Sequence, residues 1–273
     1  MRLLSRLALI AVLVAAAAGC GARDLVVDPA SPYGPDDLVL RIEGGGGMAA
    51  PDRLLTSAPF FNLYGDGRVI TTGPVPAIYP GPALPNLQLS HVGPFDPPIL
   101  ARKAVDAGVG SADVGQLQIA DGGWTRFTVL TENGEKSTQV TELNADEGLT
   151  RSQKSAREKL RKLLDELTGN PAVDRSTPYV ATEVAVSAIP WSDPGDPSLP
   201  PPPPVAWPGP ALPGPVENGR TPCLVVTGDQ AEAVLAAATK ANSLTPWTSD
   251  GKTWRIGLRP LLPDEHTCAD LNR

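Results

Sequence analysis

The sequence predicts an α+β fold built from antiparallel sheets with helices packed on one face. Apolar runs flank the turns at Gly65–Gly67 and Asn133–Gly134, which is typical of β-hairpins. Segments with helical apolar spacing lie between the hairpins. The phrase Pro-Gly-Pro-Ala-Leu-Pro occurs at Pro80–Pro85 and again at Pro208–Pro213, and each copy precedes a similar order of elements. This repeat favours two duplicated β-α-β-β-α-β modules.

The first module, residues 38–132, is expected to hold several strands and one clear helix. Alternating or β-branched runs bounded by glycine and proline predict strands at 38–42, 60–64, 68–71, 87–91 and 124–130. A short helical turn is expected at Pro51–Ser57. Pro97–Ala107 is predicted as a helix because its prolines suit a first turn, its apolar residues share one face and Gly108 can end it.

The second module, residues 133–273, contains the segment with the most helix signals. Thr150–Leu167 carries one apolar stripe, Thr150 can cap its start, and Gly169 can end it. Further elements are expected as strands at 138–143, 179–189, 224–227 and 253–258 and as a helix at 229–241. Residues 190–216 include twelve prolines, so this insertion is predicted to form polyproline II.

The repeated hexapeptide has a physical role with or without a duplication. Proline cannot donate to a β-ladder, and glycine between prolines allows a sharp bend. We therefore interpret each copy as an edge or corner crossing between the two halves of a module and not as a ligand-binding segment. Chance is the alternative explanation of the repeat, because a chain with 31 prolines and 27 glycines repeats short words readily.

The N-terminal residues predict export and lipid attachment. Two arginines precede an apolar run, Leu7–Ala18, that is too short to span a bilayer and suits a secretory signal. The stretch Ala17–Cys20 resembles the lipobox of bacterial lipoproteins, in which the cysteine is acylated and becomes the first residue. We expect a signal peptide at 1–19 and a lipidated tether at 20–37. The alternative is ordinary cleavage one residue earlier, with Cys20 incidental.

The cysteines and the charge agree with an exported protein. With Cys20 assigned to the anchor, Cys223 and Cys268 form an even pair and are predicted to form a disulfide in an oxidising compartment. Two free buried thiols are the alternative. Removal of residues 1–19 takes away two arginines and changes the formal net charge from −7 to −9. Such a surface has no general attraction for nucleic acid or anionic lipid, so membrane attachment is expected through acyl chains.

Few residues match catalytic or metal-binding motifs. The chain has two histidines, His91 and His266, and no His-Glu-x-x-His, Gly-x-Ser-x-Gly or Cys-x-x-Cys pattern. A zinc site formed by these histidines with Asp264 and Glu265 is conceivable, but no spacing requires it. Ser249–Lys252 has the Ser-x-x-Lys spacing of penicillin-binding enzymes, yet it falls in a predicted hairpin turn. We expect no metal and no cofactor.

Two groups of residues are candidates for partner binding. The longer predicted helix carries basic side chains, among them Arg151, Lys154 and Arg161, which could face anionic wall polymers or lipid head groups. The other interpretation is a solvated face with ion pairs along the helix. Trp191 and Trp207 bracket the proline-rich run and could stack on sugars or anchor a partner. Alternatively, these rings pack the run onto the domain.

The lipobox, Tyr64–Ile70 and Ala77–Pro85 give the chain a family likeness. In these stretches it resembles the uncharacterised secreted lipoproteins of high-GC Gram-positive bacteria. The resemblance implies a place on the outer face of the cytoplasmic membrane. It implies no activity, and no functional residues carry over from it.

The sequence therefore predicts a membrane-anchored lipoprotein of the cell envelope that is not an enzyme and binds an envelope protein or a cell-wall polymer. The alternative is a hydrolase that modifies the cell wall with carboxylates brought together by the fold, such as Asp66 or Asp121 with a distant partner. A cleft with two close carboxylates would favour the hydrolase. A flat apolar patch with exposed tryptophan would favour binding.

Overall fold

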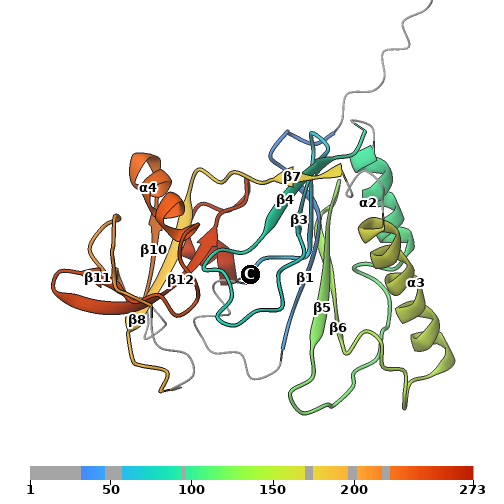
Figure 1. Cartoon of the computed structure of the whole chain (residues 1–273). Coiled ribbons are helices and arrows are strands. Elements are labelled where there is room, and N and C mark those ends of the chain that lie inside the picture. Colours follow the sequence, from blue (N-terminus) through green and yellow to red (C-terminus); the bar gives the residue numbers. More distant parts are fainter. Residues whose placement is uncertain are drawn as a thin grey trace, which may run out of the picture. The chain divides into compact units, whose positions relative to one another are not determined.

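Two β-sheets and three α-helices make up the described part of the protein in its computed structural model (Figure 1). The structure describes residues 32–46, 57–93, 96–169, 175–195, 202–216 and 222–272, all within one compact unit, Ser31–Arg273. The predicted signal peptide and Cys20 lie outside the described residues, as does nearly all of the helical turn expected at 51–57. The α+β class predicted from the sequence is confirmed.

The first sheet has seven strands in the order β6-β5-β1-β2-β3-β4-β7, and every neighbouring pair is antiparallel. Its strands are β1 (Leu38–Gly45), β2 (Phe61–Tyr64), β3 (Arg68–Thr72), β4 (Leu87–His91), β5 (Trp124–Thr131), β6 (Gly134–Thr141) and β7 (Thr177–Pro178). The turn between β2 and β3 ends at Gly67 with φ of 87°, a conformation that favours glycine. The predicted hairpin therefore forms around the Gly-Asp-Gly turn.

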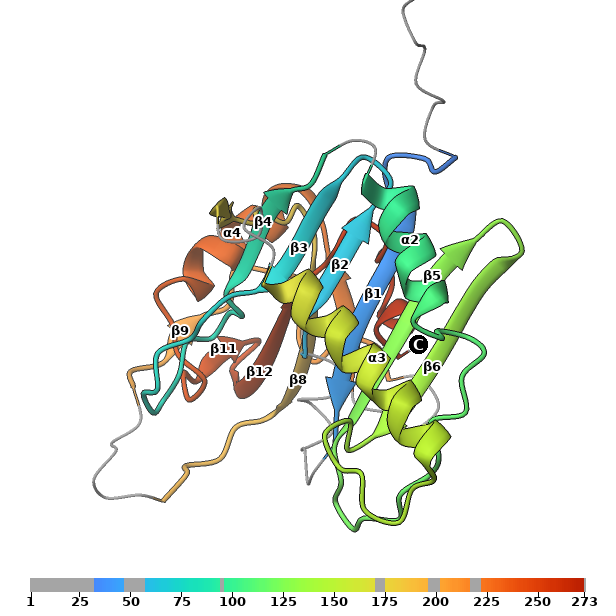
Figure 2. The same cartoon turned by 90° about the vertical axis from the view of Figure 1, so that its right-hand side faces the viewer.

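Helices α2 (Asp96–Asp106) and α3 (Arg151–Thr168) cover one face of this sheet (Figure 2). Thr150 caps α3, because its hydroxyl accepts a hydrogen bond from the Gln153 N–H while the Gln153 side chain accepts one from the Thr150 N–H. The core between sheet and helices joins strand residues to helix residues, among them Leu40, Ile42, Phe61, Phe127, Leu100, Leu160 and Leu163. The apolar stripe read from the sequence thus faces the sheet.

The second sheet has five strands in the order β10-β8-β12-β11-β9 and packs against helix α4 (Gly228–Ala238). Its strands are β8 (Val184–Pro190), β9 (Val205–Ala206), β10 (Cys223–Val226), β11 (Trp247–Ser249) and β12 (Lys252–Pro260). β9 pairs with β11 in parallel, and the other pairs are antiparallel. The predicted disulfide is present and joins Cys223 of β10 to Cys268 of the 3₁₀ helix η2 (Cys268–Asn272).

The predicted duplication is not confirmed, and the predicted boundary at 132–133 falls inside a hairpin. β5 and β6 pair across that position along their whole lengths, and the first sheet continues to β7. The hexapeptide copies also lie in unlike connections, the first between β3 and β4 and the second between β9 and β10. Turn signals are local, so they did not reveal that the chain returns to the first sheet after α3.

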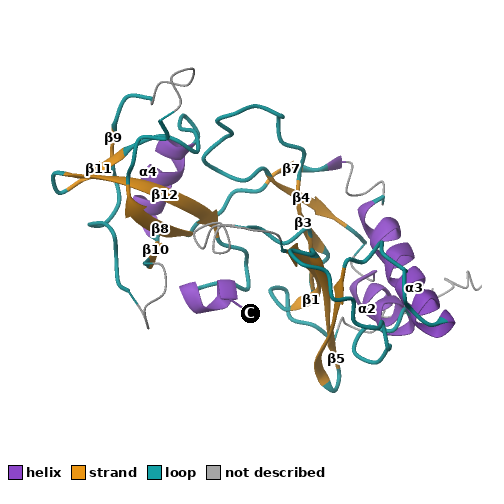
Figure 3. Cartoon of the chain, turned by 90° about the horizontal axis from the view of Figure 1, so that it is seen from below, coloured by secondary structure: helices purple, strands orange, loops and turns teal. Residues whose placement is uncertain are grey.

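The long connection between β3 and β4, residues 73–86, reaches the C-terminal end of α4 (Figure 3). Pro82 forms an isolated β-bridge with Asn242, and the Ala83 N–H donates to the Ala241 carbonyl over 3.2 Å. Main-chain bonds therefore attach this connection of the first sheet to the residues that follow α4.

Both copies of the hexapeptide contribute to a single apolar core, that of the second sheet. Ala83 and Leu84 of the first copy pack against this core, and Leu212 of the second copy lies within it. Duplicated modules would instead place the copies at equivalent positions in two cores.

Candidate functional site

A cleft of about 850 Å³ with a mainly apolar lining is the candidate binding site, and we name it the apolar cleft. Three parts of the chain that are distant in sequence form its walls, namely the β3–β4 connection, the segment between β7 and β8, and α4, and Pro260 at the end of β12 adds to the lining. Its lining residues are Pro82, Leu84, Pro85, Asn86, Leu87, Pro178, Tyr179, Val180, Ala181, Thr182, Glu183, Gly228, Glu232, Leu235, Ala236, Ala238, Thr239 and Pro260.

Helix α4 forms the first wall of the apolar cleft with one of its sides. The residues at spacings of three and four share that side and line the cleft: Glu232, Leu235, Ala236 and Thr239. Ala231 and Val234 point elsewhere and are fully buried in the core of the second sheet. This alanine-rich helix therefore uses one side for the core and another for the cleft.

The β3–β4 connection forms the second wall. The Asn86 side-chain amide donates to the Pro74 carbonyl over 2.7 Å and fixes the return of the loop to β4. Pro82 and Pro85 have no N–H groups, so their main chain adds no unpaired donors to this wall. The first copy of the hexapeptide thus crosses from β3 to β4 and also lines the apolar cleft.

The third wall is the segment Pro178–Glu183, which Tyr179 anchors. The Tyr179 N–H donates to the Leu87 carbonyl over 2.9 Å, and its hydroxyl donates to the Leu261 carbonyl over 3.0 Å. Burial raises the pKa of Tyr179 to about 12 from the ordinary 10.0, so the hydroxyl stays protonated and remains a donor even at moderately alkaline pH. The next residue, Val180, is 82% exposed. The segment thus holds an unburied apolar side chain against the cleft.

The charged residues in the lining of the apolar cleft are both acidic. Glu232 lies on α4 and Glu183 ends the third wall, and the lining includes no lysine, arginine or histidine. The nearest basic group described for Glu183 is the imidazole of His266, whose Nδ1 lies 3.9 Å from the carboxylate. The cleft therefore combines an apolar surface with negative charge.

A buried ionic cluster connects the first sheet with the C-terminal residues. Asp264 accepts hydrogen bonds from Arg41 over 2.9 Å and from the Tyr64 hydroxyl over 2.7 Å, and Glu265 accepts one from Arg259 over 2.9 Å. Burial raises the pKa of Glu265, although Arg259 and Arg41 oppose this shift. Arg41 and Asp264 are 223 positions apart, so no local motif pointed to this cluster.

The structure does not bring the conceivable zinc ligands together. Asp264 and Glu265 are engaged with arginines, whereas His91 and His266 are exposed. Within the described ranges, no group of three or more histidine, cysteine, aspartate or glutamate side chains is placed to hold a metal ion.

The serine and the two aspartates singled out in the sequence lie in turns and hairpins of the fold. Ser249–Lys252 forms the β11–β12 hairpin, as predicted, and the Ser249 hydroxyl accepts a hydrogen bond from the Leu212 N–H over 3.3 Å. Asp66 accepts one from Arg68 Nε over 2.6 Å. Asp121 is exposed in a turn with φ of 56°. None of these three sites lines the apolar cleft.

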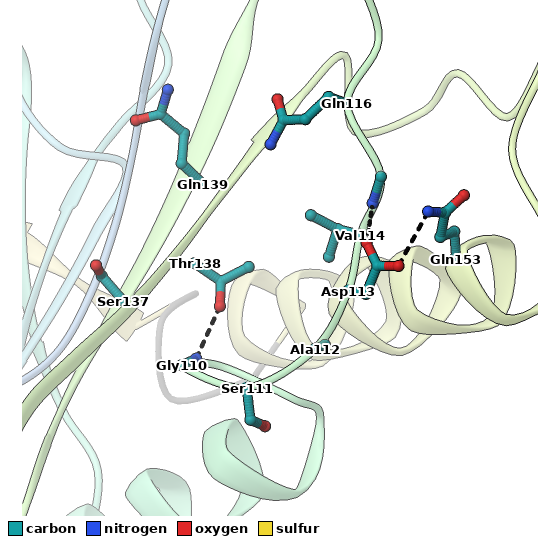
Figure 4. A pocket seen from close by; sticks show the side chains of 11 residues that line it. Gly110, Ser111, Ala112, Asp113, Val114, Gln116, Ser137, Thr138, Gln139 and Gln153 are labelled. Atoms are coloured by element: carbon teal, nitrogen blue, oxygen red, sulfur yellow. Dashed lines mark hydrogen bonds between the residues drawn. The ribbon is translucent and has the colours of Figure 1, made fainter.

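A second, polar pocket lies between the loop 110–116 and strand β6, and Figure 4 shows the side chains that line it. Its volume is about 540 Å³. The Thr138 hydroxyl accepts a hydrogen bond from the Gly110 N–H over 2.7 Å, and Gln153 Nε2 donates to Asp113 over 3.0 Å. Hydrogen bonds from the backbone of its own loop and from Gln153 lower the pKa of Asp113. These hydrogen bonds hold the loop against β6 and α3. The lining contains two serines, Ser111 and Ser137, but no histidine that could act as their general base.

The tryptophans proposed as partner anchors pack against the protein. Trp207 is buried, its indole N–H donates to the Pro210 carbonyl over 2.6 Å, and its ring meets Trp247 edge to face at 5.7 Å. Trp191 is partly buried, and its indole N–H donates to the Leu244 carbonyl over 3.4 Å. The interpretation as an exposed ring is wrong for Trp207, because the second hexapeptide closes over it.

The exposed basic cluster on α3 is smaller than its sequence suggests. Arg151 and Lys154 are exposed, as predicted. Arg161 instead bonds to Asp146 over 3.2 Å and to Glu158 over 3.1 Å. The alternative of a solvated helix face with ion pairs accounts for these contacts.

Arg157 is a further basic residue of α3, but its side chain has no exposed area. Its guanidinium donates to the Val114 carbonyl over 2.7 Å and to the carbonyls of Thr141, Glu142 and Ala145 over 2.7 to 3.0 Å. A basic residue at a core-facing position of the helical stripe was the available signal for this role. Arg157 therefore holds loops together and does not face a partner.

No helix in the part of the chain that is described has the length and apolar content to cross a bilayer. The case for a binding site rests on the geometry of the apolar cleft. Comparisons with protein-family models, curated protein sequences and solved structures found no match.

Proposed function

We propose that the protein is a membrane-tethered binding protein of the cell envelope, held by an acylated Cys20, whose apolar cleft receives a segment of a partner protein. The observation that carries this proposal is the cleft itself, with its volume of about 850 Å³ and its lining of proline, leucine, alanine and valine. Sites for ligands have volumes of about 300–1,000 Å³. Burial of apolar surface is favourable by about 25 cal/mol per Å², so an apolar occupant gains free energy here.

A cell-wall polymer fits this lining less well than a protein does. Sugar hydroxyls that lose water need polar partners, and each one left unpaired costs free energy. The aromatic ring of the lining belongs to Tyr179, and its hydroxyl is already bonded to Leu261. An apolar protein segment is therefore the better occupant.

The hydrolase alternative has weaker support. It would have to use Glu183 and Glu232, the carboxylates of the apolar cleft. A catalytic acid is usually enclosed in an apolar pocket that keeps its carboxyl protonated. Glu232 is instead exposed on the surface of α4.

The cysteines support export of the protein. Disulfides such as Cys223–Cys268 persist in oxidising compartments, which include the outer face of the cytoplasmic membrane. The third cysteine, Cys20, stands where a lipobox cysteine would be acylated. Both features favour a protein anchored by lipid on that face.

Site-specific photo-crosslinking in living cells tests the proposal. A photoreactive amino acid replaces Val180 at the cleft in one strain and Lys159, an exposed residue of α3, in a control strain. We expect one dominant protein adduct from position 180 and none from position 159. The same adducts from both positions, or none from position 180, would contradict a partner in the cleft. Release of soluble fragments from purified cell wall would support the hydrolase.

A further inference from the structure

We infer that the occupant of the apolar cleft is an extended peptide segment that carries apolar side chains and at least one lysine or arginine. This inference rests on the proposed function and adds the chemistry of the partner. Three features support it: the outer side of α4, the main chain of the third wall, and the charges of the lining.

The outer side of α4 provides an apolar surface that remains to be covered. Leu235 is half-buried and Ala236 is exposed, and both line the cleft together with Leu84 and Leu87 of the second wall. Val180 adds a side chain that is 82% exposed. Apolar area of this kind, gathered in one concave site, favours an occupant with apolar side chains.

The third wall has main-chain groups that an extended peptide can pair with. β7 is the last strand of the first sheet and ends at Pro178, which has no N–H, and β8 begins at Val184. Between them, the N–H groups of Val180, Ala181 and Thr182 have no acceptor among the residues that the structure describes. Successive residues of an extended segment direct their main-chain groups to opposite sides, so a strand added at this edge would pair with alternate residues, such as Val180 and Thr182.

The charges of the lining select a basic segment. Glu183 lies on the third wall and Glu232 on the first, and no basic side chain lines the cleft. A lysine or arginine of the peptide would meet a carboxylate, and an acidic side chain would be repelled. A small apolar molecule would cover the walls but would leave the amide groups of the third wall unpaired, so a peptide fits the observations better.

Selection from a display library of random heptapeptides tests this inference. The target is the purified full-length chain with the substitution Cys20→Ala, which prevents acylation. We expect the enriched peptides to share apolar residues at alternate positions and a lysine or arginine. Fluorescence anisotropy then compares the tightest peptide with two altered forms, one with its basic residue changed to glutamate and one with N-methylated amides. Each alteration should weaken binding about tenfold or more, because it removes a charge pair or strand pairing.

Two protein variants separate the apolar cleft from the rest of the surface. Glu232→Lys reverses a charge of the cleft, and Glu135→Lys reverses an exposed charge on β6 as the matched control. We expect about a tenfold loss of affinity for the first variant and less than about a twofold change for the second. Thermal unfolding followed by circular dichroism verifies that both variants are folded.

Several results would overturn the inference. These are no enrichment, enrichment of acidic peptides, and binding that is equal in the wild type and Glu232→Lys. Binding of dodecylamine, a cationic amphiphile, without any enriched peptide would also overturn it, because the cleft would then take a small molecule. A crosslink from position 180 with a failed selection would contradict the peptide chemistry alone. If no protein is crosslinked from position 180, the result contradicts the proposed function itself.

Discussion

Main-chain carbonyl groups solvate the buried guanidinium of Arg157. Five carbonyl oxygens accept from it, contributed by the loop before β5, by the last residue of β6 and by the residues that follow β6. Burial lowers the pKa of Arg157. The planar fork of arginine reaches several acceptors at once, which the single ammonium of lysine does not. Arg157 therefore joins α3 to two loops.

The substitution Arg157→Lys should lower the free energy of unfolding by about 2–4 kcal/mol, because several buried carbonyls lose their donors. The control is Arg151→Lys, an exposed position at the start of the same helix, where we expect a change below about 0.5 kcal/mol. Urea unfolding measures both values. Equal effects at the two positions would show that the carbonyl contacts are not important for stability.

The buried hydroxyl of Tyr179 should make the free energy of unfolding fall at alkaline pH. Burial is the largest cause that raises its pKa from 10.0 to about 12. The folded protein therefore keeps a proton that the unfolded chain has already lost, and the contribution to stability is lost as pH rises from 10 to 12. Tyr179→Phe should reduce the fall in the free energy of unfolding over this range, as measured by chemical denaturation.

Tyr79→Phe serves as the control, since Tyr79 is 63% exposed. Burial also raises the pKa of Tyr64, so part of the alkaline fall should persist in Tyr179→Phe. An unchanged pH profile in Tyr179→Phe would refute the role assigned to its hydroxyl.

The disulfide ties η2 to β10, an edge strand of the second sheet. Cys223 and Cys268 are 45 residues apart, and closing a loop of that length is worth about 3–4 kcal/mol in loop-entropy models. Replacing both cysteines with serine should lower the free energy of unfolding by that amount. Cys20→Ser is the matched control and should leave it unchanged. Alkylation of Cys223 or Cys268 in the unreduced protein would show that the bond is absent in solution.

Elements with local signals could be predicted from the sequence. The cap at Thr150 and the turn at Gly65–Gly67 placed α3 and the β2–β3 hairpin to within a few residues. β7, β9 and β11 were missed, because two or three residues are too few to show alternation. The module boundary was wrong for a related reason: membership of a sheet depends on pairing between distant strands.

The apolar cleft could not be predicted, because its walls come from three separate segments. The sequence did offer one partial signal. Glu232–Thr239 places Leu235 and Ala236 on a side of α4 that only partly packs against the core. Nothing in the sequence indicated that the first hexapeptide would stand opposite that side.

Membrane attachment is predicted to depend on Cys20 alone. In Cys20→Ala we expect the protein in the culture medium, because the acyl chains would be missing and the net negative charge gives no attraction to anionic lipid. Fractionation and immunoblotting measure this, and Cys223→Ser with Cys268→Ser is the control that should stay with the membrane. Membrane-bound Cys20→Ala protein would remove the anchor from the proposed function.

The two sheets share stabilising contacts instead of forming separate modules. The first hexapeptide packs on the core of the second sheet, and Leu262 packs with Tyr64, Ile70 and Leu87 of the first sheet. Residues that are distant in sequence thus pack together in the same cores. Separate expression of either sheet would expose apolar residues that the other now covers.

The pair formed by Arg41 and Asp264 has a consequence for biosynthesis. A ribosome makes the chain from its N-terminus, so 223 positions are added after Arg41 before its carboxylate partner exists. A buried charge that lacks its partner is strongly destabilising. A polypeptide terminated before residue 264 would lack the carboxylates of Asp264 and Glu265, so the guanidinium would keep its hydrogen bond to Asn62 but lose both ion pairs and be less stable when buried. The fold thus distinguishes finished chains from incomplete ones.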